Sequence, residues 1–255
     1  MADVEPVVRH ADPAFRADVL AGLAAPVPAI PARWFYDHRG SELFEEITRL
    51  PEYYPTRTET ALLQRYSAEI AAEVGPGKAV IEFGSGSSAK TPTLLRAIHP
   101  SAYVPVDISG DFLRESAAGL QAEFPDLPVY PVEADFTRQF DLPPEVEAAP
   151  KLGFFPGSTI GNLVAATAVD LLRAMKETLG EGSRLVIGVD RIKDVDTLVR
   201  AYDDAAGVTA AFNLNLLKRI NRELGADFDI TKFTHYANYR PIEGSARSFL
   251  ISRED

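Results

Sequence analysis

The sequence predicts a doubly wound α/β fold: a Rossmann-like parallel sheet with helices on both faces, joined to a second, smaller lobe. Short apolar segments alternate with amphipathic ones through the middle of the 255-residue chain. A glycine-rich turn follows the first apolar segment, and the alternation stops after Asp190. Alternation of this kind is typical of βαβ units, whose right-handed crossovers place helices on both faces of a sheet.

The N-terminal segment has a different composition. The first 33 residues are rich in alanine and proline and end in the proline-bearing run 26–31. Prolines at this density favour an extended arm laid over the body of the protein. Apolar residues at helical spacing then predict a short helix over 41–50, and Pro51 and Pro55 bracket a loop over 52–54.

The alternating middle of the chain supplies the sheet. Helical periodicity is found over 59–74, 91–98, 111–123 and 164–179. Gly75 and Gly180 end the first and last of these helices, and Ser109 is placed to cap the third. The predicted strands are 78–83, 102–107, 128–133, 152–155 and 184–190.

After Asp190 the pattern predicts two helices, 194–204 and 209–224, and then two strands, 232–240 and 246–252, arranged as a hairpin. This is not a further βαβ unit, so we expect a lobe that covers the ligand-binding edge of the sheet. Three parts follow: an arm with part of the substrate lobe (1–58), the nucleotide-binding domain (59–190) and the rest of the substrate lobe (191–255).

Composition excludes several functions. A net charge of −11 disfavours nucleic acid as a partner, because an acidic surface repels phosphate. The N-terminus lacks the pattern of a secretory signal, and no apolar run reaches the length of a membrane span, so we expect a cytoplasmic protein. The chain has no cysteine, and its four histidines lack ligand spacing, so no metal site is expected.

The turn after the first strand contains Gly84, Ser85, Gly86 and Lys90. Ligands of parallel sheets bind beyond the carboxyl ends of the strands, where glycines let the backbone approach closely and a helix N-terminus offers free N–H groups. The turn also fits the dinucleotide pattern G-x-G-x-x-A, so it leaves NAD open as a ligand.

Acidic residues at strand ends narrow the choice of ligand. Asp107 ends the second strand, 23 residues after Gly84, where a carboxylate can bind a ribose diol. Asp135 and Phe136 follow the third strand, where an acid and a ring suit adenine. This additional acid favours S-adenosylmethionine (SAM), which is cationic and lacks a pyrophosphate, over NAD. Each of these aspartates could instead be a helix cap.

The loop after the fourth strand, 155–162, contains Gly157, Gly161 and Asn162. The glycines permit an unusual backbone path, and the Asn162 amide offers both a donor and an acceptor to a substrate. Asn162 is equally well placed to cap the helix that follows.

Four segments together carry a family resemblance: 34–37 (WFYD), 50–59 (LPEYYPTRTE), 157–162 (GSTIGN) and 200–213 (RAYDDAAGVTAAFN). From about residue 29 onward the chain resembles the histidine Nα-methyltransferases of ergothioneine biosynthesis, which have a class I methyltransferase fold. The family trimethylates the α-amine of histidine to give hercynine, and fungal relatives methylate a tryptophan derivative.

The resemblance implies a role for individual residues. Tyr36 and the backbone of Gly157 would lie near the substrate amine. Tyr53, Asn162 and Tyr202 would hold the α-carboxylate. The methyl donor would contact the glycine turn and the acids, namely Gly84, Ser85, Gly86, Lys90, Asp107, Asp135 and Phe136.

Two departures from the family pattern are visible. The family continues with two more strands and a segment that reads the imidazole, so this chain is expected to be a fragment or a shortened relative with an exposed sheet edge. In addition, Arg247, Ser248 and Phe249 stand where the family has Glu, Met and a polar residue. Ser248 in the side-chain pocket leaves the identity of the amino-acid substrate open.

Two other functions remain compatible with the sequence. One is an NAD(P)-dependent oxidoreductase, although the chain lacks the Tyr-x-x-x-Lys pair of many such enzymes. The other is a non-catalytic SAM-binding fragment. No strongly apolar helix face is left over in the pattern, so we expect a monomer.

Overall fold

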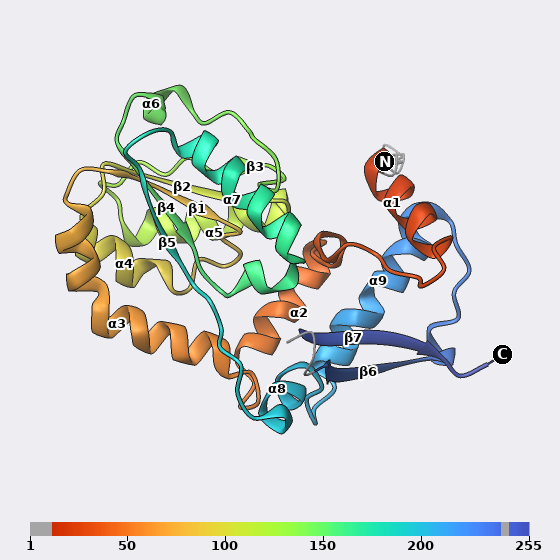
Figure 1. Cartoon of the computed structure of the whole chain (residues 1–255). Helices are drawn as coiled ribbons and strands as arrows, with labels where there is room; N and C mark the ends of the chain where they lie inside the picture. The colour runs from red at the N-terminus through yellow and green to blue at the C-terminus, as the bar shows by residue number, and fades with distance from the viewer. Residues whose placement is uncertain (1–11, 241–244, 255) are drawn as a thin grey trace, which may run out of the picture.

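The structure is a computed structural model that describes residues 12–240 and 245–254. A five-stranded parallel sheet in the order β3-β2-β1-β4-β5 forms its centre (Figure 1). Chain order reverses between β1 and β4, so the loops that follow these two strands lie side by side at the switch point. The strands are β1 (Ala79–Phe83), β2 (Ala102–Asp107), β3 (Val132–Glu133), β4 (Lys151–Phe155) and β5 (Arg184–Ile187).

Helices cover both faces of the sheet. One face carries α3 (Tyr54–Val74), α4 (Thr91–Ile98) and α5 (Gly110–Glu123), and the other carries α6 (Pro144–Glu147) and α7 (Ala165–Leu179). Alternate β1 side chains enter opposite cores, Val80 on the first face and Ile81 and Phe83 on the second. All five residues of β1 are therefore buried, as in sheets covered on both sides. The predicted doubly wound fold is confirmed.

A second group of elements lies beside the sheet (Figure 1). It contains α1 (Pro13–Leu23), η1 (Ala32–Phe35), α8 (Val195–Tyr202), α9 (Val208–Leu224) and η3 (Ile230–Lys232). The strands β6 (Phe233–Arg240) and β7 (Ser245–Ser252) pair antiparallel, which confirms the predicted hairpin. Its core joins both ends of the described chain, because Phe15 and Trp34 pack with Leu216, Leu217 and Ile220.

Helix α2 (His38–Thr48) connects this group to the sheet. It contacts α9 on one side and α3 and α5 on the other. Asp37 is its N-cap and accepts a hydrogen bond from the Gly40 N–H at 2.8 Å. The same carboxylate accepts from Asn215 and Arg222 of α9, so one residue fixes both the start of α2 and its position against α9.

Two element predictions need correction. The expected extended arm contains helix α1, because Asp12 accepts the Ala14 N–H and Pro13 occupies the first helical turn. Residues 1–11 of that arm lie outside the described residues. The strand predicted over 128–133 is reduced to β3 and a bridge at Val129, because Pro128 and Pro131 have no N–H to donate.

Strand β5 forms one edge of the sheet. Its residues are exposed or half-buried, whereas β1 and β4 are buried throughout. Among the described residues β5 pairs with β4 alone, so the exposed edge expected from the sequence is present.

Candidate active site

The glycine turn after β1 has the backbone that its sequence predicts. Gly84 and Gly86 have φ values of +71° and +51°, a region that L side chains rarely adopt. A Cβ on Gly84 would lie 3.3 Å from the Phe136 ring, so the turn and Phe136 are in close contact. The Ser85 hydroxyl is buried and lacks a hydrogen-bond partner among the described residues, as expected for a group that binds a ligand.

Asp107, at the end of β2, organises this turn. Its two carboxylate oxygens accept the N–H groups of Gly86 and Ser109, each at 3.0 Å. Burial raises the pKa of Asp107 above its ordinary value, although the hydrogen bonds from Ser109 and Gly86 lower it. The carboxylate thus borders the turn at the sheet edge where a ribose is expected.

Asp135 and Phe136 occupy the next strand end. Phe136 packs edge-on against Phe155 at 5.8 Å and Phe83 at 6.4 Å. The Asp135 carboxylate accepts from the Thr137 hydroxyl at 2.5 Å and from the Arg33 guanidinium at 2.6 Å. Both oxygens of the Asp135 carboxylate therefore have protein partners. One of these partners, Arg33, belongs to η1, which lies outside the sheet.

Arg33 and Asp135, but not Phe136, border a hollow of about 340 Å³ between η1 and the end of the sheet. Arg33 and Trp34 form one wall, and Ile108 and Asp135 form the other. The hollow lies directly after the ends of β2 and β3, so it is the place that the sequence predicts for adenine.

Aromatic side chains form a second cluster, made by Tyr36, Tyr53 and Tyr202 with Phe44 and Phe212. Tyr36 packs edge-on against Phe44 at 5.6 Å and Phe212 at 5.5 Å, and Tyr53 packs on Tyr202 at 6.2 Å. The three tyrosines come from η1's C-cap, the start of α3 and the end of α8. Distant segments thus bring together the three tyrosines that the sequence singled out.

Burial raises the pKa of all three phenols. The negative charge of Asp107 acts on Tyr36 in the same direction. Tyr202 acts on Tyr53, and Asp190 acts on Tyr202. The cluster therefore presents uncharged hydroxyls at neutral pH.

The lobe holds Tyr202 in place through its backbone. His235 of β6, whose side chain is 1% exposed, hydrogen-bonds the Tyr202 carbonyl through Nε2 at 2.8 Å. Asp204 then accepts the N–H groups of Val208 and Thr209 and so begins α9. The hairpin and α9 together fix the end of α8.

The loop after β4 faces the glycine turn. Gly157, with φ +84°, donates its N–H to both oxygens of Glu59, at 2.9 and 3.0 Å. Lys90, from the turn after β1, forms an ion pair with the same carboxylate. The structure therefore brings Lys90 and Gly157 together through Glu59, to which the sequence reasoning gave no role. Its only signal was its place in segment 50–59.

Asn162 and Ser248 are both exposed. Asn162 ends η2 (Thr159–Asn162), and Val164 is the N-cap of α7, without a side-chain capping bond. The alternative of Asn162 as a helix cap is therefore wrong. Ser248 lies opposite Ala237 in the hairpin, and among the described residues no hydrogen bond or ring contact joins it to the tyrosine cluster.

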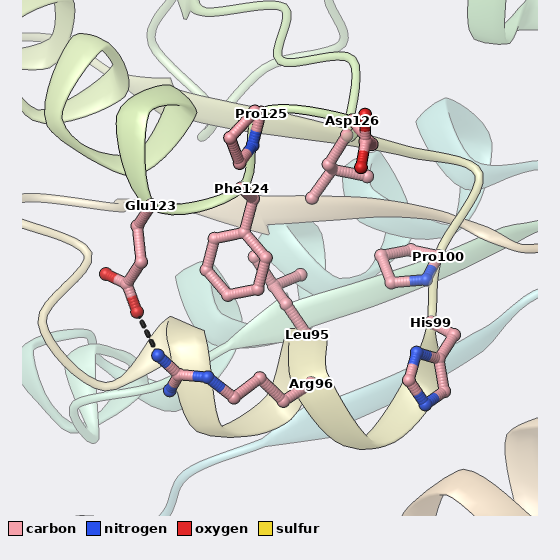
Figure 2. A pocket seen from close by; sticks show the side chains of 9 residues that line it. Leu95, Arg96, His99, Pro100, Glu123, Phe124, Pro125 and Asp126 are labelled. Atoms are coloured by element: carbon pink, nitrogen blue, oxygen red, sulfur yellow. Dashed lines mark hydrogen bonds and ion pairs between the residues drawn. The ribbon is translucent and has the colours of Figure 1, made fainter.

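A larger hollow of about 460 Å³ lies elsewhere, between the end of α4 and the end of α5 (Figure 2). Arg96 and Glu123 pair across it, and Arg96 lies over the Phe124 ring. It follows the carboxyl ends of helices, at the side of the sheet where strands begin. It contains none of the predicted site residues.

The described residues also allow metal binding and membrane insertion to be judged. They contain no group of three or more potential metal-ligating side chains. None of their helices is long and apolar enough to cross a membrane.

The strand order, the glycine turn after β1 and the acids after β2 and β3 define the class of this protein, which is that of the doubly wound SAM-dependent methyltransferases. Residues 15–255 match the family described as "Histidine-specific methyltransferase, SAM-dependent". The chain belongs to this family, as the resemblance in its sequence predicted. The family match favours methyl transfer over the NAD(P)-dependent alternative.

Curated relatives agree. The chain is 46% identical over 244 residues to a histidine N-alpha-methyltransferase of Mycolicibacterium smegmatis, covering 94% of this chain and 75% of that protein. It is 42% identical to a protein of the same name from Mycobacterium tuberculosis, covering 93% and 74%. It is 31% identical to ergothioneine biosynthesis protein 1 of Neurospora crassa, covering 77% of this chain and 23% of that protein.

Proposed function

We propose that this chain transfers methyl groups from SAM to the α-amine of histidine, three times in succession, to form hercynine for ergothioneine biosynthesis. One observation supports this most directly: helix α3, which begins beside Tyr53 of the tyrosine cluster, carries Glu59, whose carboxylate holds Lys90 of the glycine turn and the Gly157 N–H. An acceptor held by the tyrosines would therefore lie beside a donor held by the turn. Two relatives that bear the name histidine N-alpha-methyltransferase support histidine as the acceptor.

The donor site fits SAM. The Ser85 hydroxyl is buried without a partner among the described residues, and Gly84 lets the turn lie against the Phe136 ring, where a side chain would collide. Asp107 would bind the ribose, and Asp135 and Phe136 would border the adenine, with Gly86 and Lys90 completing the turn. Because Arg33 already donates to Asp135, adenine would share that carboxylate with the guanidinium.

The acceptor site fits an amino acid. Phenolic hydroxyls at Tyr53 and Tyr202 and the Asn162 amide would bind the α-carboxylate by donating hydrogen bonds. None of these groups is a cation, so the carboxylate is held without a positive charge beside the sulfonium. Ser248 is the proposed contact to the side chain of the acceptor.

The sulfonium supplies an activated methyl group, so the main task of the protein is to align donor and acceptor. The attacking amine has to be neutral. The Tyr36 phenol is protonated at neutral pH, and burial raises its pKa further, so its oxygen would accept a hydrogen bond from the amine rather than act as a phenolate base. The backbone at Gly157 would border the same amine.

Mass spectrometry of the products tests this proposal. The chain is incubated with SAM and separate amino acids, including histidine and tryptophan. A product heavier by three methyl groups from histidine alone is the expected result. Methylation of another amino acid would indicate that Ser248 and its neighbours select that acceptor in place of histidine. No product, together with binding of S-adenosylhomocysteine (SAH), would favour the non-catalytic SAM-binding alternative.

Calorimetry separates the remaining ligand classes. We expect SAH to bind and NAD not to bind, and the reverse would support an oxidoreductase. We further expect a cytoplasmic monomer whose partner is the small-molecule amino acid, without nucleic acid or membrane. Light scattering after gel filtration checks the oligomeric state.

A further inference from the structure

The Glu59 carboxylate lies where the ends of three strands meet. It accepts the Gly157 N–H after β4 and pairs with Lys90 after β1. It also touches the residue after β5, because a Cβ on Gly188 would lie 2.1 Å from Glu59 Oε1. The side chain comes from the second turn of α3, so a helix outside the strand ends reaches into the site.

The pair is largely shielded from water. The side chains of Glu59 and Lys90 are 17% and 18% exposed. Hydrogen bonds between charged partners in such surroundings are stronger and more directional than neutral ones. The carboxylate therefore restricts both the Lys90 ammonium and the Gly157 peptide.

Glu59 also balances charge at this place. The donor brings a positive sulfonium, and an unpaired ammonium nearby would repel it. With Glu59 present, the pair carries no net charge. A lysine can then lie in the donor site without raising the local positive charge.

We infer that Glu59 is a positioning residue for methyl transfer, which orients Lys90 toward the donor and fixes the Gly157 peptide beside the acceptor. This inference rests on the proposed function. Glu59 touches neither reactant itself and acts through the two residues it holds.

The first test is Glu59→Gln. Glutamine keeps the size of the side chain and an oxygen for the Gly157 N–H, but it removes the charge opposite Lys90. We expect kcat with histidine and the affinity for SAH each to fall about tenfold, the usual effect of losing one charged hydrogen bond. The KM for histidine should stay close to that of the wild type, and a fall in melting temperature without a loss of kcat and SAH affinity would instead indicate a role limited to helix packing.

Coupling to Lys90 gives a second readout. SAH affinity is measured by calorimetry for Glu59→Gln, Lys90→Gln and the double variant. If Glu59 acts through Lys90, the double variant loses clearly less than the two single losses combined. Fully additive losses would overturn the inference. This cycle needs no amino-acid acceptor, so it remains informative even if the wild type methylates no histidine and the proposed function fails.

Gly188→Ala tests the geometry without touching a charge. The added methyl would collide with Glu59 Oε1 and displace it from Gly157. We expect a loss of kcat similar to that of Glu59→Gln. Glu69→Gln, an exposed position on the same helix, is the matched control and should behave like wild type. Wild-type kcat and SAH affinity in Glu59→Gln would overturn the inference.

Discussion

Burial affects the chemical properties of individual side chains at this site as much as their neighbours do. Tyr36, Tyr53 and Tyr202 are phenols that are uncharged at neutral pH at their ordinary pKa, and burial raises their pKa values further. Asn162 lies at the opposite extreme: it is exposed and has no hydrogen-bond partner among the described residues. A polar amide without a structural partner can be removed at little cost to the fold, so its loss should affect the substrate alone.

Asn162→Ala should raise the KM for histidine about tenfold or more, because the α-carboxylate loses a hydrogen-bond donor. The affinity for SAH should stay unchanged. Steady-state kinetics and calorimetry provide the two measurements. An equal loss of both affinities would contradict the assignment of Asn162 to the acceptor site.

Glu82 is a buried acid beneath the glycine turn. It is 2% exposed and accepts hydrogen bonds from Tyr103 at 2.5 Å and Thr91 at 2.7 Å. Burial raises its pKa to about 7, although both hydrogen bonds act to lower it. The folded protein thus keeps a proton that the unfolded chain releases at lower pH.

The proton on Glu82 makes the free energy of unfolding depend on pH. Between pH 4.5 and 7 the folded state binds more protons at Glu82, so the free energy of unfolding falls as pH rises, by on the order of 1 to 3 kcal/mol. Glu82→Gln should lose this part of the pH dependence. Urea unfolding of both proteins at pH 5 and pH 8 measures it, and an equal decline in both would refute the role of Glu82.

At the scale of elements, η1 links α1 to the sheet. Arg33 donates to Asp18 of α1 at 2.7 Å and to Asp135 after β3 at 2.6 Å. Trp34 donates to the same Asp18 at 2.8 Å, and its carbonyl accepts from Arg219 of α9. These bonds hold the N-terminal helix over the end of the sheet.

Arg33→Ala should lower the free energy of unfolding by about 1 to 2 kcal/mol, because two partly buried charged hydrogen bonds are lost together. Arg173→Ala removes an ion pair whose partners are 70% and 71% exposed, and this control should cost under about 0.5 kcal/mol. Urea unfolding compares the two, and equal losses would show that the Arg33 bridge adds nothing.

Periodicity predicted most elements because each strand and helix is determined by nearby residues. The terminal helix α1 was missed, since its three alanines give little amphipathic pattern. The acids of the site were identified from their places at strand ends, and the tyrosines from the family resemblance. Glu59 was not, because its partner Gly157 is 98 positions away and nothing local in the sequence indicates the pair. The Arg33–Asp135 bridge, spanning 102 positions, was missed for the same reason.

At the scale of the whole molecule, one small core joins residues from both ends of the described chain. Phe15 is fully buried, lies 5.1 Å from the Trp34 ring and is covered by the Arg219 guanidinium. It has no part in the two cores of the sheet. Damage at Phe15 should therefore affect the lobe first, and it also reaches the donor site through Trp34, which lines the hollow predicted for adenine.

Phe15→Ala should lower the free energy of unfolding of the lobe by about 3 to 5 kcal/mol through the cavity it leaves. Histidine methylation and SAH affinity should both fall, because Phe15 supports Trp34 in the wall of the hollow predicted for adenine. Val27→Ala, at a side chain 77% exposed in the same arm, is the control and should be close to neutral. Wild-type SAH affinity in Phe15→Ala would contradict this connection between the lobe core and the donor site.

The packing of α1 against α9 also affects the order in which parts of the chain can fold during translation. About 180 residues separate the end of α1 from the start of α9, which supplies its packing partners. At translation rates of about 5 to 20 residues per second, Phe15 and Trp34 leave the ribosome roughly 10 to 40 seconds before α9 is made. The sheet can form during that interval, whereas the acceptor lobe cannot. A nascent chain can thus acquire its nucleotide-binding half first, and the aromatic residues Phe15 and Trp34 lack their α9 partners until α9 has been made.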